Sequence, residues 1–425
     1  MKMNKVLFIG ILLVFLLFIS CSKDDDSEID YSNSIKIGVI LPFSGESAAY
    51  GSHEMQAINL AVKEINDAGG VLGKDIALIV KNSSSDPVYG PIAALELVED
   101  EEVLAILGAD RSDVSFSILN MIEEYNFPII SGSAVSNYLT GMYPHGVFFR
   151  TVSDDVAIAE KIALRMLTLG DTTHVRIIYV DDIYGSTQAN IVEYYFEYLG
   201  GDVEIERILP FESGKFSYYE EIESLFIEVD TLSEAIPNIV LIAYPKCGAQ
   251  IIRDWKVSGY EANWILSDCL KTEAFIQYAG SQNVEGLIGI SSYAGENNYV
   301  QYNKFKEAYE EFTGEDPTQH RCLENWYDAM ILLAYAIIKA DTLDPETIRN
   351  SLVTISAPPG STVTVGEFRI GKDILNTEVL EDTVVVRLNI NYEGASGNVN
   401  FNVDGDVVGH CEFWEIENGK FVTIP

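Results

Sequence analysis

Residues 175–208 read "VRIIYVDDIYGSTQANIVEYYFEYLGGDVEIERI", and residues 35–81 follow the same plan. Each stretch begins with an apolar run, passes through a loop into Tyr-Gly-Ser and a helical pattern, and ends with Gly-Gly and a second apolar run. In the earlier copy, Met55, Ile58 and Ile65 have the spacing of one helix face. The repeat predicts two lobes of like topology.

The same alternation of short apolar runs and helical periodicities continues along much of the chain. Alternation of this kind indicates α/β lobes, each a doubly wound parallel sheet with helices on both faces. The expected strands are 35–41, 76–81, 103–107, 128–131, 147–150, 175–180, 203–208, 238–243, 263–267 and 287–290. The expected helices are 52–67, 90–100, 113–125, 155–169, 186–199, 215–229, 248–258 and 300–313.

Each Gly-Gly falls where a helix is expected to end. Glycine accepts the left-handed conformation needed at that cap, so the glycines are interpreted as structural. Because "GGVLG" follows a helix instead of preceding one, it does not offer a phosphate site at a helix start. We expect no cofactor.

The chain begins "MKMNKVLFIGILLVFLLFISCSKDDD". Its apolar run, 6–19, is shorter than the roughly 20 residues of a membrane-spanning helix, which indicates a signal peptide over residues 1–20. "FISC" resembles the lipobox of bacterial lipoproteins, which are cut before the cysteine and lipidated on Cys21. Residues 21–34 are then a lipidated acidic tether. An uncleaved anchor is the alternative, and both interpretations place the protein outside the cytoplasm.

The charge balance excludes one class of partner. The chain has 27 basic and 65 acidic side chains, and removal of Lys2 and Lys5 with the signal peptide leaves 25 against 65, a net charge of −40. Nucleic acid is therefore not expected as a partner. A hydrophobic fraction of 48% indicates a real core under an acidic surface, and about 400 residues suggest two lobes.

Four cysteines follow Cys21, and their spacing matches no zinc signature. Cys247 and Cys269 each come shortly after an expected strand. A bridge between these two and a pair of buried free thiols both remain open.

Ligands of open parallel sheets bind outside the carboxyl ends of the strands. One lobe places hydroxyl groups there and the other places aromatic rings and a carboxylate, an arrangement that suits a small molecule with an anionic and a cationic end. The residues at these positions are Ser44, Tyr50, Ser112, Ser133, Ser136, Tyr184, Tyr244 and Asp268. These residues also have structural interpretations. Ser112 is a plausible helix N-cap, the tyrosines are plausible packing residues, and Asp268 is a plausible turn former.

Several motifs carry a family resemblance, among them "IGVILPFSGESAAYG", "ILGADRSD", "FPIISGSAVSNYLT", "VDDIYGS" and "INYEGASGNVNFNVDGD". From about residue 35 to its end the chain resembles the periplasmic type 1 solute-binding proteins of the branched-chain amino acid transporter type. The resemblance implies two lobes joined by three crossovers that hinge on a ligand. It also implies an insertion near 373–389.

The lobe boundaries follow from the same resemblance. Lobe 1 is expected to comprise 35–153 and 285–408, and lobe 2 to comprise 154–284 and 409–425. The crossovers are expected near 151–155, 283–287 and 406–410.

The resemblance also assigns roles to individual residues. It implies that a ligand carboxylate is held by Ser112, Ser133 and Ala134. Val135 stands where the family usually has a threonine hydroxyl, and the neighbouring Ser136 offers a hydroxyl in its place. It implies aromatic walls from Tyr50, Tyr184 and Tyr244, and a contact between Asp268 and the ligand's ammonium group.

We therefore expect a lipid-anchored solute-binding protein that delivers an amino acid or related small molecule to an ABC permease. A sensor or scavenger of the same fold is the alternative. A hydrolase is not expected, because the sequence has no "GxSxG" motif and none of its five histidines lies at the strand ends named above. No metal site is expected, and His53 is interpreted as an exposed residue in the first helical turn.

Overall fold

The computed structural model describes residues 33–141, 146–169, 175–201, 203–227, 236–293, 299–381 and 384–424. The predicted signal peptide, Cys21 and nearly all of the predicted tether lie outside this part of the chain. Within it, no helix has the length and apolar character needed to cross a membrane.

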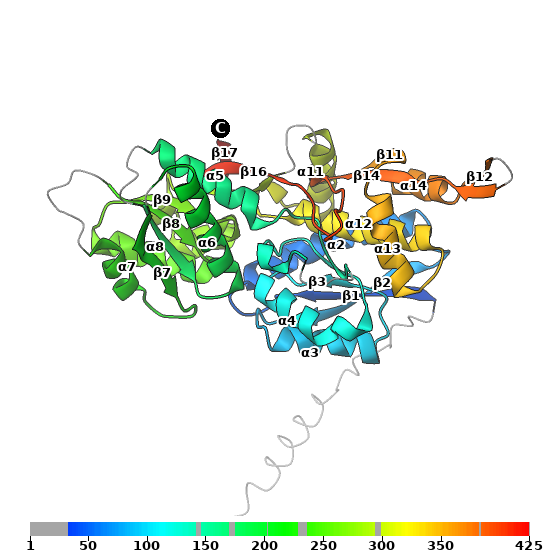
Figure 1. Ribbon diagram of the computed structural model, residues 1–425, viewed down its shortest axis with the longest axis horizontal. Coiled ribbons are helices and arrows are strands. Elements are labelled where there is room, and N and C mark those ends of the chain that lie inside the picture. Colours follow the sequence, from blue (N-terminus) through cyan, green and yellow to red (C-terminus); the bar gives the residue numbers. More distant parts are fainter. Residues whose placement is uncertain are drawn as a thin grey trace, which may run out of the picture. The chain divides into compact units, whose positions relative to one another are not determined.

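The first sheet is wholly parallel and has the order β2-β1-β3-β4-β5 (Figure 1). Its strands are β1 (Ser34–Leu41), β2 (Asp75–Asn82), β3 (Ile106–Gly108), β4 (Ile129–Ser131) and β5 (Phe148–Arg150). Helices α3 (Tyr89–Leu95) and α4 (Ser112–Ile122) lie on one side of it, and α2 (Ala48–Asp67) lies on the other. This sheet and its helices are called lobe 1 below.

The second sheet has the order β17-β16-β10-β9-β8-β6-β7. Its parallel strands are β6 (Val175–Val180), β7 (Val203–Phe211), β8 (Asn238–Ile242), β9 (Asn263–Leu266) and β10 (Ile288–Tyr293). Two antiparallel strands, β16 (His410–Glu417) and β17 (Lys420–Ile424), extend its edge. Its helices are α5 (Asp155–Thr168), α6 (Ile183–Tyr198), α7 (Tyr219–Phe226), α8 (Pro245–Ser258), α9 (Glu273–Ala279) and α10 (Ser281–Val284). This assembly is called lobe 2, and the predicted fold class is confirmed.

The two predicted Gly-Gly helix ends are built in the same way. After α2, Gly69 has φ +82° and the amide of Gly70 donates to the carbonyl of Ile65 at 3.0 Å. After α6, Gly200 has φ +91° and the amide of Gly201 donates to Phe196 at 2.9 Å. A six-residue closure of this kind needs a left-handed residue, which glycine adopts at low cost.

The two Tyr-Gly-Ser motifs also share a structural reason for their glycine. A Cβ on Gly51 would lie 2.4 Å from the carbonyl oxygen of Pro42, and one on Gly185 would lie 2.0 Å from that of Val180. In both lobes the first turn of the helix thus packs directly on the end of the preceding strand. The glycine permits that contact.

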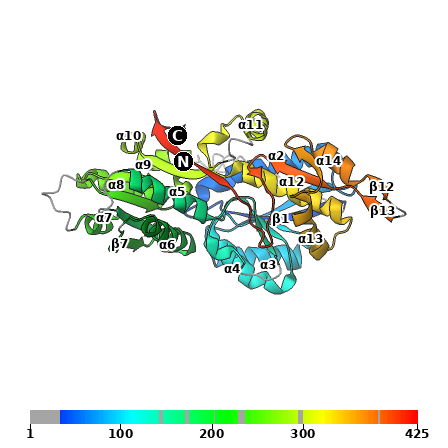
Figure 2. The same cartoon turned by 45° about the horizontal axis from the view of Figure 1, so that its top comes forward.

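The chain between β10 and β16 belongs mainly to lobe 1. Helix α11 (Tyr299–Thr313) and the long helix α12 (Leu323–Ala340) both pack against α2. Helices α13 (Pro345–Ile355) and α14 (Phe368–Leu375) pack on α12. A small sheet is formed by β11 (Ser361–Thr364), which lies between these two helices in the chain, with β14 (Ile390–Gly394) and β15 (Gly397–Asn398). The predicted insertion contains an antiparallel hairpin of β12 (Glu378–Glu381) and β13 (Val384–Arg387), which projects beyond α14 (Figure 2).

One predicted crossover is wrong. The chain was expected to return to lobe 1 near 283–287, but β10 pairs with β9 and β16 and is therefore part of the second sheet. The return follows Tyr293, since α11 packs on α2. The first and third crossing segments lie side by side, because Ser153 pairs with Val407, and the other expected lobe boundaries stay predictions.

Candidate functional site

The first turn of α2 carries Tyr50 toward lobe 2. Its side chain is buried, and its hydroxyl donates to the carbonyl of Cys269, which follows β9. The guanidinium of Arg321 lies 4.7 Å from the ring centroid. From the loop before α2, the carbonyl of Gly45 accepts from Nζ of Lys246 in lobe 2 at 2.6 Å. This loop therefore contacts both lobes.

The predicted hydroxyl groups of lobe 1 cluster at the ends of β3 and β4. Oγ of Ser112 accepts from the amide of Ser136 at 3.2 Å, and Oγ of Ser133 donates to Oδ1 of Asp110 at 3.0 Å. The amide of Ala134 donates to Ser131 Oγ at 3.0 Å. These groups are thus engaged within lobe 1.

Ser136 and its neighbour Val135 both contact lobe 2, the first through a hydrogen bond and the second through apolar packing. Oγ of Ser136 donates to Oγ1 of Thr187 in α6 at 3.0 Å, so it joins the two lobes. Val135 is buried among apolar residues of lobe 2. The hydroxyl absent at Val135 is therefore replaced by a packing contact.

Two tyrosines of lobe 2 each donate a hydrogen bond to a carboxylate. Tyr184 donates to Oδ1 of Asp268 at 2.8 Å, and Tyr244 donates to Oδ2 of Asp182 at 3.0 Å. The two rings are 5.5 Å apart. All four groups come from the carboxyl ends of β6, β8 and β9, as the sequence predicts for a parallel sheet.

Two buried arginines contact both lobes, and the sequence pattern predicts neither of them. Nη2 of Arg321 lies 3.0 Å from Oδ1 of Asp110, and Nη1 lies 3.6 Å from Oδ2 of Asp268. Nη2 of Arg111 lies 2.7 Å from Asp113 and 3.0 Å from Asp182.

The side chains that meet between the two lobes at these strand ends are called the strand-end cluster. It comprises Tyr50, Asp110, Arg111, Ser112, Asp113, Ser133, Ser136, Asp182, Tyr184, Tyr244, Asp268 and Arg321. Arg111 lies inside the motif "GADRSD", beside the predicted Ser112, so its neighbourhood was the signal that pointed to it. Arg321 lies in a region with no recognised pattern.

Acidic groups outnumber the two arginines in this neighbourhood. Burial and the nearby Asp110 raise the pKa of Glu54 well above its ordinary value. Burial raises the pKa of Asp182 to about 6, although Arg111 beside it favours the charged form. Within the described chain, Oε2 of Glu54 and Oδ2 of Asp110 are buried acceptors without a hydrogen-bond partner. The cluster is thus suited to hold positive charge as well as negative charge.

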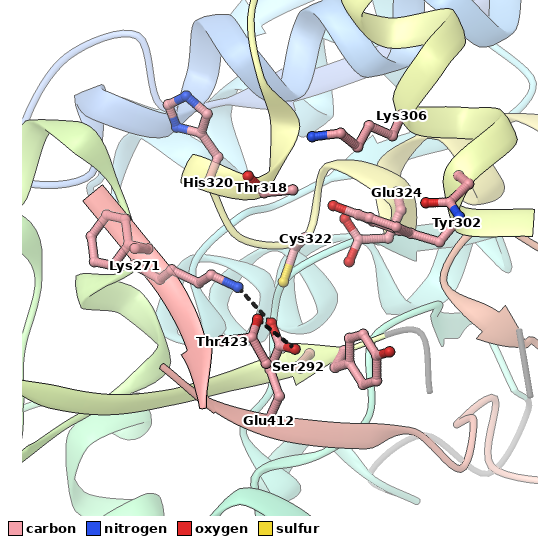
Figure 3. A pocket seen from close by; sticks show the side chains of 13 residues that line it. Lys271, Ser292, Tyr302, Lys306, Thr318, His320, Cys322, Glu324, Glu412 and Thr423 are labelled. Atoms are coloured by element: carbon pink, nitrogen blue, oxygen red, sulfur yellow. Dashed lines mark hydrogen bonds and ion pairs between the residues drawn. The ribbon is translucent and has the colours of Figure 1, made fainter. Parts of the chain in front are cut away.

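A cavity of about 370 Å³ adjoins the cluster, and none of the predicted site residues lines it. Its walls include Cys322, next to Arg321, and Lys271, whose Nζ pairs with Glu412 at 2.9 Å (Figure 3). The four described cysteines are all buried free thiols, so Cys247 and Cys269 form no bridge.

The model of a family described as periplasmic binding protein matches residues 34–371. The chain belongs to the periplasmic binding protein family. Two curated relatives of this periplasmic binding protein are a chemotactic signal transduction system substrate-binding protein, BasB, from Halobacterium salinarum and a Leu/Ile/Val-binding protein homolog 7 from Brucella suis. The first is 23% identical over 86% of this chain and 83% of its own length. The second is 22% identical over 78% and 84%.

A solved structure gives the same result for the fold. The leucine binding protein LivK from Thermotoga maritima superposes with a TM-score of 0.74, at 22% identity, over 92% of this chain and 98% of its own. This likeness agrees with the family match and shows that the chain has the fold of these binding proteins.

Proposed function

We propose that this protein captures an amino acid, or a small molecule with the same two charged ends, at the strand-end cluster. The observation that carries the proposal is the pair of contacts made by Arg321, one to each lobe. An α-amino acid placed beside Asp268 would offer its ammonium group to that carboxylate and its carboxylate to Arg321. The ligand would replace a 3.6 Å ion pair with two shorter charge-assisted contacts.

In this proposal, Tyr50, Tyr184 and Tyr244 form the walls around the ligand. Ser112, Ser133, Ala134 and Ser136 lie near its carboxylate end, where the start of α4 supplies amide donors. The charged partner of the carboxylate is then an arginine, in addition to the serines that the sequence indicates. Because the contacts come from both lobes, a ligand with both charges favours their association.

The ligand is proposed to pass to an ABC permease, with the protein held at the membrane by lipid on Cys21. No enzymatic step is proposed. A sensory role is the second candidate, supported by the relative that serves a chemotactic system. The two roles share the cluster, and they differ in whether uptake of the ligand requires this protein.

The experiment compares leucine with two analogues, leucinamide, which lacks the carboxylate, and 4-methylpentanoate, which lacks the ammonium group. A bound ligand at a hundredfold excess over its Kd stabilises the fold by about 2.7 kcal/mol, which thermal unfolding detects. We expect leucine, or another α-amino acid from a screen, to bind more tightly than its matched analogues. Equal binding of an analogue that lacks either charge would contradict the proposal.

A further inference from the structure

A second cluster of ligating side chains lies outside the strand-end cluster and includes His53 of α2. His53 and Tyr50 are both in the first turns of α2, while Glu315 and His320 flank the short helix η6 (Pro317–Gln319). Nδ1 of His53 lies 3.0 Å from Oε2 of Glu315, and the rings of His53 and His320 are stacked with centroids 3.9 Å apart. His53 is therefore not the freely exposed residue that the sequence suggested.

From this arrangement we propose that His53, Glu315 and His320 together bind a divalent transition-metal ion. One ligand atom from each residue lies within 4.8 Å of the other two. The ligands of a tetrahedral zinc site, each about 2.0–2.2 Å from the metal, lie a little over 3 Å apart. A shift of about 1 Å in the side chains would bring the three donors to this spacing and leave the fourth position to water.

The chain holds the backbone of these residues in place while leaving two side chains free to adjust. The amide of Glu315 donates to Oγ1 of Thr313 at 3.1 Å. Side-chain exposures of 24% for His53 and 42% for Glu315 leave both groups room to turn. His320 is buried, and its backbone pairs with Thr272 of lobe 2. One fixed ligand and two adjustable ones thus face the same point.

The chemistry of the three donors selects the kind of metal. A neutral imidazole offers a metal the lone pair of one ring nitrogen. Two imidazoles and one carboxylate suit Zn²⁺, Ni²⁺, Co²⁺ or Cu²⁺ and not the hard cations Ca²⁺ and Mg²⁺. His320 also lines the cavity next to the strand-end cluster (Figure 3).

The test is calorimetric titration of the chain, produced without a polyhistidine tag, with Zn²⁺ and with Mg²⁺. We expect one equivalent of Zn²⁺ to bind and Mg²⁺ not to bind. His53→Gln, Glu315→Gln and His320→Gln should each weaken Zn²⁺ binding by at least roughly tenfold. Each removes a direct ligand, and loss of even an outer-shell partner costs about 10–100-fold in metal affinity. His410→Gln, at an exposed histidine on β16, is the matched control and should bind as the parent does.

Three results would overturn the proposal: no Zn²⁺ binding by the parent, unchanged binding in all three site variants, or loss of binding in the His410 control. If His320→Gln does not fold, X-ray absorption of the Zn²⁺-loaded parent decides the question. Two imidazole ligands in its first shell support the site, and a shell without imidazole contradicts it. Binding of leucine is measured separately, so failure of this site leaves the ligand-binding proposal unaffected.

Discussion

Nη1 of Arg321 lies 3.6 Å from Oδ2 of Asp268, and both side chains are buried. The same guanidinium makes a closer contact, 3.0 Å, with Asp110 of lobe 1. Arg321 thus has a short ion pair within lobe 1 and a longer one to lobe 2. A buried ion pair must offset the desolvation of both charges, and a long one does so poorly. Of the two carboxylates near Arg321, Asp268 is therefore the one with which a ligand's ammonium group would form the more favourable ion pair.

Asp268→Asn should weaken binding of an α-amino acid by about 2–5 kcal/mol, because it leaves a buried ammonium without its counter-charge. The amide oxygen can still accept from Tyr184, so the shape of the site is kept. Calorimetric titration with leucine, or with whichever amino acid the screen selects, measures the loss. Asp373→Asn, on an exposed position of α14, is the control. Equal affinity in parent and Asp268→Asn would show that the ligand has no ammonium group there.

Arg321→Gln should lower the free energy of unfolding by about 3–5 kcal/mol, because removal of one partner leaves buried carboxylates uncompensated. Asp110 and Asp268 would both lose their cation. The comparison variant is Arg387→Gln, whose side chain is 35% exposed and pairs with Asp341 and Glu378. Exposed pairs of that kind contribute about 0–1 kcal/mol. Urea unfolding of both variants gives the two values, and similar losses would argue against a special role for Arg321.

Gly51→Ala and Gly185→Ala should each destabilise the fold by about 1–3 kcal/mol, the usual cost of forcing an added carbon into a packed site. The new methyl group would lie against a strand-end carbonyl, at 2.4 Å and 2.0 Å respectively, so the backbone must move. Ser52→Ala, at the exposed neighbouring position, should change stability little. Unfolding in urea tests all three. If the glycine variants kept full stability and lost only ligand affinity, the glycines would be serving the ligand instead.

Much of the fold follows from local pattern, as the ten strands predicted up to residue 290 show. Their apolar runs are bounded by turn residues, and the two copies of the strand–helix unit support each other. Helix α12 escaped prediction because it is buried all round. It has no polar face, and without one a helical period is not visible in the sequence.

The candidate site was predictable only where residues follow strands directly. Asp268 and Tyr244 were found in this way, since parallel strands align their carboxyl ends. Arg321 was not, because 211 positions separate it from its partner Asp110 and no local pattern records that contact. The pairing of His53 with His320 was missed for the same reason.

Asp155→Asn should change how stability depends on pH. Burial raises the pKa of Asp155 to about 8, well above its ordinary value of 3.8, so the folded protein holds this proton long after the unfolded chain has released it. The contribution of this group to stability is therefore fully present below about pH 4 and is lost as the pH rises toward about 8. Within that window the expected slope is about 1.4 kcal/mol per pH unit.

Asparagine mimics the neutral acid, since its carbonyl can accept from the amide of Asn137, which lies 3.0 Å from Oδ1 in the parent. Urea unfolding of parent and variant at a series of pH values isolates the effect, because the other titrating groups cancel in the difference. We expect the stability of the variant relative to the parent to rise steadily from pH 4 to pH 8. A difference that stays constant across this range would mean that Asp155 is ionised in the folded protein, with a counter-charge near its second oxygen.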